Sequence, residues 1–135
     1  MQLLLKNDIS QVALLPDFID QVCDSYSIDP TLNFQLNLVL EEAVVNVIDY
    51  AYPEGGEHTF SLDVDKTADM LIFTLKDDGL PFNPLEQAPE VDITLDAEDR
   101  AIGGLGIFLV QQMMDDVEYQ RTPEGENVLV MKKKA

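Results

Sequence analysis

Hydrophobic residues recur along the chain with two different spacings, which separate predicted helices from predicted strands. The first stretch of helical spacing contains Pro16, which places the start of a helix near that residue. A second helix is predicted from Asp29-Pro30, where a capping carboxylate precedes a proline at the first helical position, to about Tyr52. A third helix opens at a glycine run and ends near Met114.

Alternation of apolar and polar residues predicts the strands. Residues 60–65 and 71–76 follow this period of two, which is typical of strands with one buried face. Further strands are expected at residues 3–5, 117–121 and 127–133. The mixed order, with helices early and hairpins late, favours an α+β fold: a two-layer α/β sandwich with helices on one face of a mostly antiparallel sheet.

Between the predicted strand at residues 71–76 and the third helix, residues 80–103 show no regular period and contain three prolines. A span of this length exceeds the ordinary connections of a compact domain and indicates a functional loop or lid. The 135 residues otherwise fit one domain, 1–135, that is long enough to bury a core without disulfides or structural metal.

Charge narrows the possible partners. The chain has 26 acidic against 8 basic residues and a formal net charge of -18, while 46% of its residues are hydrophobic, which indicates a folded acidic protein. Such a surface repels phosphate backbones, so no nucleic acid is expected to bind directly, and a basic protein segment is favoured. A bound polyphosphate would need local backbone N–H groups or a metal cation.

Cysteine usage and hydropathy give an expected location. Cys23 is the single cysteine, so no intramolecular disulfide can form, which fits a reducing cytosol. The apolar stretch in the opening MQLLLKND is too short for a signal peptide, and no run of about 18 apolar residues follows. We therefore expect a cytoplasmic protein with no membrane partner.

The predicted second helix carries a polar stripe. Glu42, Asn46 and Asp49 stand at i, i+4 and i+7, flanked by apolar residues that favour a groove. An Asn carbonyl is a neutral oxygen ligand suited to Mg²⁺, and a Glu one turn away can orient or deprotonate a hydroxyl. A solvated helix face is the alternative interpretation, and spacing alone favours it.

Two further motifs have a similar pair of interpretations. Asp77 ends a predicted strand and Gly79 follows in a turn, so the carboxylate can accept a hydrogen bond from a ligand amine, although a turn alone explains the pair equally well. Gly103, Gly104 and Gly106 open the third helix without the Lys-Ser/Thr of a P-loop. They can bring backbone N–H groups close to an anion or permit tight helix–sheet packing.

The order of these motifs is more informative than any one of them. Glu-x-x-x-Asn on a helix, Asp-x-Gly after a strand, and a long loop ending in Gly-x-Gly resemble the Bergerat ATP-binding fold of the gyrase and histidine kinase superfamily. Within it, LEEAVVNVIDYAYP, DDGLPFNPL and IGGLGIFLVQQMMDDVEY are similar to the bacterial anti-sigma factor serine/threonine-protein kinases. The resemblance covers nearly the whole chain.

The resemblance implies ATP and Mg²⁺ as cofactors and a role for each motif. Glu42 would be the catalytic base and Asn46 the Mg²⁺ ligand. Asp77 would accept a hydrogen bond from the adenine amine, and Gly79 would form part of the floor beneath the base. Asn127 stands where the family often has a Thr or Ser that supports this aspartate, which puts that supporting bond in doubt.

The same resemblance places the triphosphate against Gly103, Gly104 and Gly106. Arg100 either reaches the terminal phosphate or lies solvated in the lid, and the family pattern favours the second. Pro81 replaces a glycine of the wider superfamily, as it does in the anti-sigma branch.

The predicted function is therefore an ATP-dependent serine/threonine-protein kinase that phosphorylates a serine on an antagonist protein and switches partners in transcriptional regulation. The implied partners are a sigma factor, an antagonist (anti-anti-sigma) protein or both, and a homodimer is a further possibility implied by the family. The alternative is a nucleotide-binding regulatory module without kinase activity.

Overall fold

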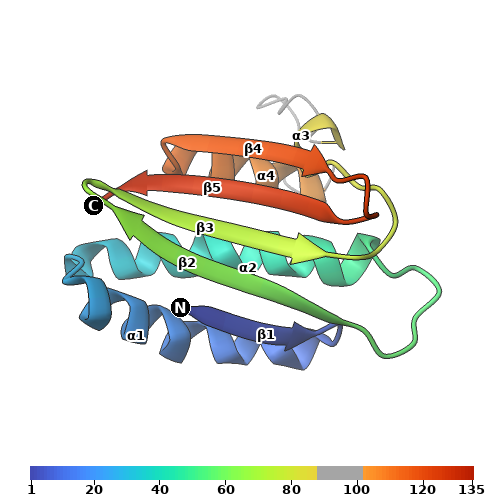
Figure 1. Ribbon diagram of the computed structural model, residues 1–135, viewed down its shortest axis with the longest axis horizontal. Helices are drawn as coiled ribbons and strands as arrows, with labels where there is room; N and C mark the ends of the chain where they lie inside the picture. The colour runs from blue at the N-terminus through green and yellow to red at the C-terminus, as the bar shows by residue number, and fades with distance from the viewer. Residues whose placement is uncertain (88–101) are drawn as a thin grey trace.

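The computed structural model describes residues 1–87 and 102–135, and five strands in this part of the chain pair into one antiparallel sheet of order β1-β2-β3-β5-β4 (Figure 1). The strands are β1 (Gln2–Lys6), β2 (Thr59–Thr67), β3 (Met70–Asp77), β4 (Asp116–Arg121) and β5 (Asn127–Lys134). Strand β5 lies between β3 and β4, and its first residue, Asn127, is paired with the last residue of β3, Asp77. The topology thus brings two polar residues 50 positions apart to one end of the sheet.

The helices cover one face of this sheet, as Figure 1 shows. They are α1 (Leu15–Tyr26), α2 (Asn33–Tyr50), the short α3 (Pro84–Gln87) and α4 (Ile102–Met113), with 3₁₀ turns η1 (Ile9–Leu14) and η2 (Pro30–Leu32). The expected α+β sandwich is confirmed. None of the helices in the described ranges has the length and apolar character needed to cross a membrane.

The boundaries of α2 differ from the sequence prediction at both ends. Asp29 Oδ1 accepts a hydrogen bond from the Thr31 N–H at 3.0 Å, as a cap should, but the turn that it caps is 3₁₀. The α-helix itself begins at Asn33 and ends at Tyr50 rather than Tyr52. Just beyond this end, the Ala51 carbonyl accepts the N–H of Leu80, from the turn after β3, at 2.9 Å.

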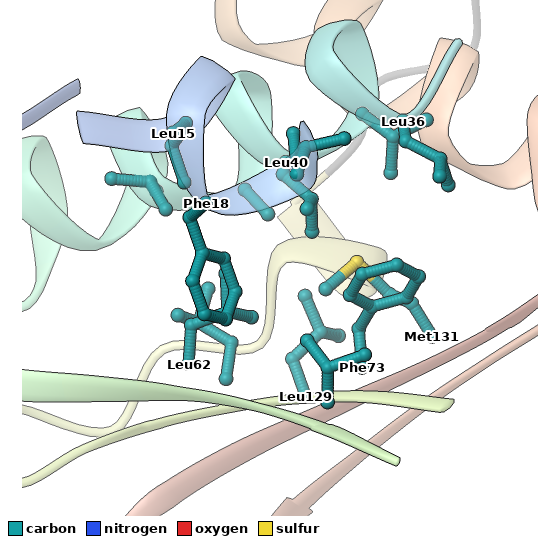
Figure 2. Packing of buried hydrophobic residues seen from close by; sticks show 14 of the residues in the cluster. Leu15, Phe18, Leu36, Leu40, Leu62, Phe73, Leu129 and Met131 are labelled. Atoms are coloured by element: carbon teal, nitrogen blue, oxygen red, sulfur yellow. The ribbon is translucent and has the colours of Figure 1, made fainter. Parts of the chain in front are cut away.

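The core lies between the helical layer and the sheet. Figure 2 shows Phe18 of α1 and Leu40 of α2 pointing toward Leu62 and Phe73 on the strands, and all four side chains are buried. The burial of β2 and β3 alternates residue by residue, as their sequences predict. Among the described residues, three amide or carboxyl side chains are buried with this core: Asn46, Asp77 and Asn127.

Two predictions fall on the loop before α4. The expected irregular span of residues 80–103 contains the short helix α3, and α4 begins at Ile102. Residues 88–101 of that span, which include Arg100, lie outside the described residues.

Candidate functional site

The three buried polar side chains line one small cavity between α2 and the paired ends of β3 and β5. Its lining residues are Ala43, Asn46, Val47, Leu75, Asp77, Phe82, Pro84, Tyr119, Asn127 and Leu129. An apolar cavity with a few convergent polar groups is the usual form of a small-molecule site. Polar groups are costly to bury, so their presence together in one cavity indicates a binding role.

Asp77 presents one carboxylate oxygen that the described protein does not use. Its Oδ1 accepts two hydrogen bonds, from the Gly79 N–H and from Asn127 Nδ2, each at 2.9 Å. Both donors go to the same oxygen, so Oδ2 remains available to a ligand donor such as an amine. Burial raises the pKa of the Asp77 carboxyl, and the two hydrogen bonds act in the opposite direction.

Asn127 uses its whole amide to fix this arrangement. Nδ2 donates to Asp77 Oδ1 and, at 2.7 Å, to the Leu80 carbonyl. Oδ1 accepts from the Tyr119 hydroxyl at 2.6 Å and from the Phe82 N–H at 3.2 Å. Because a backbone N–H can only donate and a carbonyl can only accept, the amide has one possible orientation. The supporting bond to Asp77 that the sequence put in doubt is present.

The turn after β3 needs glycine because it passes against the end of α2. A Cβ at Gly79 would collide with the Ala51 carbonyl oxygen and would stand 2.6 Å from the Ala51 Cβ. On its other side, the Gly79 carbonyl accepts a hydrogen bond from Arg121 Nη1 at 2.8 Å. The close approach explains why this position is a glycine, and the role of Gly79 beneath a base stays a prediction.

The polar stripe of α2 divides between the cavity and the surface. Asn46 is buried in the cavity wall, so the solvated-face interpretation is wrong for this residue. Glu42 is partly exposed, and burial, followed by the nearby charge of Glu41, raises the pKa of its carboxyl. Asp49 and Glu41 are exposed.

Asn46 also carries a chemical signal of its own. Its Nδ2 is fully buried and has no hydrogen-bond partner among the residues that the structure describes. Buried polar atoms are nearly always paired, and an unpaired donor at a cavity wall indicates a position where an acceptor atom of a ligand or water completes the bonding.

The glycine run lies where the sequence placed it, at the start of a helix. Gly103, Gly104 and Gly106 belong to the first turns of α4, and α4 lies next to α2 in the helical layer (Figure 1). Their proposed contact with phosphates stays a prediction.

Two aromatic residues that line the cavity, Tyr119 and Phe82, were missed by the sequence reasoning. Tyr119 lines the cavity from β4, on the face that its alternation predicts to be covered, so the strand pattern held the signal. Tyr50 stacks on Phe82 with ring centroids 4.9 Å apart. This contact joins the end of α2 to the segment after β3, and no local pattern predicts it.

Comparison with known proteins identifies the family of the chain. The sequence matches the family described as histidine kinase-like ATPase domain over residues 5–133. The chain therefore belongs to the histidine kinase-like ATPase domain family.

Curated relatives of the chain carry the names anti-sigma F factor and serine-protein kinase RsbW. The chain is 31% identical over 100 residues to the anti-sigma F factor of Bacillus subtilis, an alignment that covers 72% of this chain and 67% of that protein. It is 33% identical over 102 residues to the serine-protein kinase RsbW of Listeria monocytogenes, with 72% and 63% of the two chains covered. The resemblance to anti-sigma factor kinases expected from the motifs is confirmed.

A solved structure shows the same fold. A chain in the crystal structure of the SiaB-SiaC complex from Pseudomonas aeruginosa superposes with a TM-score of 0.59 at 12% identity, covering 100% of this chain and 89% of that one. At this identity the likeness establishes the fold.

Proposed function

We propose that the chain is an ATP-binding serine/threonine-protein kinase of the anti-sigma factor type, which phosphorylates a serine on an antagonist protein and thereby switches partners. The observation that carries the proposal is the cavity in which Asp77, oriented by Asn127, lies together with Asn46, whose Nδ2 has no partner among the described residues. The names of the relatives, anti-sigma F factor and serine-protein kinase, support the reaction class.

The residues of the cavity fit ATP and Mg²⁺. Asp77 Oδ2 is free of the two donors that occupy Oδ1 and can accept the amine of an adenine. Rotating the Asn46 amide by half a turn exchanges its nitrogen and oxygen, so the position of the unpaired atom can equally present the oxygen that Mg²⁺ prefers.

The described residues contain no cluster of three His, Cys, Asp or Glu side chains that could hold a metal alone. Asn46 would therefore share the ion with phosphate oxygens, which is the common arrangement for Mg²⁺ in phosphoryl-transfer sites. Gly103 and Gly104 would direct backbone N–H groups of the first turn of α4 to the phosphates, and Gly106, one position into the next turn, would leave room for their close approach.

The chemistry assigned to the chain's own residues is positioning and proton transfer. When bound, Mg-ATP supplies the phosphoryl group and the metal neutralises phosphate charge. Glu42 would accept the proton of the substrate serine hydroxyl at a carboxylate oxygen. The partial burial that raises its pKa makes Glu42 a stronger proton acceptor than a fully solvated glutamate.

The partners belong to the same proposal. A sigma factor and an antagonist protein would compete for the chain, and the acidic surface, with a net charge of -18, suits a basic segment of a sigma factor. A homodimer and a cytoplasmic location are further parts of the proposal.

The test is phosphate transfer from γ-labelled ATP to a panel of purified small antagonist domains, with phosphoserine located by mass spectrometry. We expect transfer by the wild-type protein, and a loss of at least a hundredfold in Glu42→Ala with ATP affinity retained, because the base acts in the transition state. Glu41→Ala is the matched control, because Glu41 is the exposed neighbour of Glu42. A wild-type protein that binds ATP but phosphorylates no domain of the panel would instead favour a regulatory module without kinase activity.

A further inference from the structure

Tyr52 connects the end of α2 to the residue beside Asp77. Its side chain is buried, and its hydroxyl donates to Asp78 Oδ1 at 2.8 Å. Burial raises the pKa of the Tyr52 phenol well above its usual range, so the hydroxyl remains a donor throughout the neutral range. The bond therefore ties the segment just after α2 to the residue after the proposed base-recognising carboxylate.

The Tyr52 ring is itself held in place. It stacks on His58, with ring centroids 4.3 Å apart and planes within 8°. The His58 N–H donates to Asn7 Oδ1 at 2.9 Å, and the Asn7 N–H donates to the His58 carbonyl at 3.1 Å. The aromatic platform under Tyr52 is thus anchored to the segment that follows β1.

Three consecutive residues of the turn rest on the end of α2. Asp78 accepts from Tyr52, Gly79 lies in contact with Ala51, and the Leu80 N–H donates to the Ala51 carbonyl at 2.9 Å. Only the first of these three attachments is made by a side chain.

We propose that Tyr52 is a positioning residue that orients Asp77 toward the nucleotide base by holding Asp78. This inference rests on the proposed function, because it concerns recognition of the base in the same cavity. Hydrogen bonds weaken steeply when donor and acceptor are misaligned, so a small rotation of the turn would weaken acceptance of an amine by Asp77 Oδ2. Binding of the phosphates, which the proposed function places at Asn46 and the start of α4, would be unaffected.

The test compares two nucleotides that differ at the atom Asp77 would recognise. Inosine triphosphate has a carbonyl where ATP has its amine, and both carry the same triphosphate. We would measure the Kd of each, with Mg²⁺, for wild type, Tyr52→Phe, Asp78→Ala and the double variant. Tyr26→Phe is the matched control, since the Tyr26 hydroxyl donates to the Val64 carbonyl at 3.2 Å and neither residue lines the cavity.

In Tyr52→Phe we expect ATP affinity to fall about tenfold, which corresponds to the loss of one good hydrogen bond, while inosine triphosphate affinity stays within about twofold. Asp78→Ala should give the same loss, and the double variant should add nothing further. Asp78→Asn keeps an oxygen acceptor for the hydroxyl and should restore most of the preference for ATP.

Either of two results would overturn the inference: an unchanged preference for ATP in Tyr52→Phe, or an equal weakening of both nucleotides, which indicates a general structural role. If Tyr52→Phe does not fold, the Asp78 variants give the same comparison. If wild type and Tyr52→Phe both bind ATP more tightly than inosine triphosphate to the same degree, this inference is contradicted and the proposed function is not. A wild-type protein that binds neither nucleotide contradicts the proposed function as well.

Discussion

At the residue scale, the site is defined by polar groups that cost stability. Asp77 is 6% exposed, and its pKa is raised because burial penalises the charged form. A carboxyl whose pKa is higher in the folded than in the unfolded protein favours folding at acid pH and loses that contribution as the pH rises through the folded pKa. At neutral pH, ionised Asp77 therefore lowers the free energy of unfolding, a cost that a binding role explains.

Asp77→Asn should remove this cost and the function together. The amide can keep accepting from Gly79 and Asn127 through its oxygen, while its nitrogen replaces the free oxygen Oδ2. We expect Tm at pH 7 to rise by a few degrees, with the difference from wild type shrinking as the pH is lowered and Asp77 becomes protonated. Thermal unfolding between pH 4 and pH 8, with ATP binding at pH 7, measures both effects.

A variant that is less stable than wild type at pH 7, or that binds ATP unchanged, would contradict this account of Asp77. Asp63→Asn is the control, because Asp63 is a partly exposed residue of β2 outside the cavity.

The candidate residues could be read from the sequence because each lies in a short local motif. The spacing of Glu42 and Asn46 and the pair Asp77 and Gly79 are patterns of a few residues. The bonds of Asn127 and Tyr52 depend on sheet pairing and helix packing over 26 to 50 positions, which local spacing does not encode.

At the scale of elements, the turn from Asp77 to Phe82 is clamped between two parts of the fold. The end of α2 holds one side through Ala51, and Arg121 of β4 and Asn127 of β5 hold the other. Tyr50 also stacks on Phe82 of this turn, and Phe82 lines the cavity. The position of the turn is thus set by packing between elements.

Gly79→Ala tests this clamp. The added Cβ meets backbone at Ala51, which cannot move without displacing the end of α2, so we expect a loss of about 1–3 kcal/mol in the free energy of unfolding. ATP binding should weaken as well, because the turn carries Asp77. Urea unfolding and nucleotide titration check the two effects.

Gly55→Ala is the comparison for Gly79→Ala. Gly55 has φ +75° with no described heavy atom within 4 Å of an added Cβ, so only the cost of the left-handed backbone remains, about 1 kcal/mol. Its ATP affinity should match that of wild type. Equal affinities in wild type and Gly79→Ala would show that the turn does not position the site.

The element order was predictable because burial on one face imposes clear periods on β2, β3 and α1. The exact ends of α2 were not, because a 3₁₀ turn precedes the α-helix and the Ala51 carbonyl just past its end is bonded to a distant residue, Leu80. Helix ends decided by tertiary contacts leave no pattern in the local sequence.

At the scale of the whole molecule, the charge works against the proposed ligand. A net charge of -18 repels the anionic triphosphate of ATP over the whole surface. Binding therefore requires local compensation, from a cation at Asn46 and from backbone N–H groups at the start of α4. Magnesium dependence thus follows from the net charge as well as from the cavity.

The most direct test of the central claim is titration calorimetry of ATP into the wild-type protein, with and without Mg²⁺, repeated on Asn46→Ala. Asn37→Ala is the matched control on α2, because the Asn37 amide bonds only within the helix, to Asn33, among the described residues. The account predicts magnesium-dependent binding that Asn46→Ala loses and Asn37→Ala keeps. Absence of binding by the wild-type protein at millimolar ATP with Mg²⁺ would contradict it.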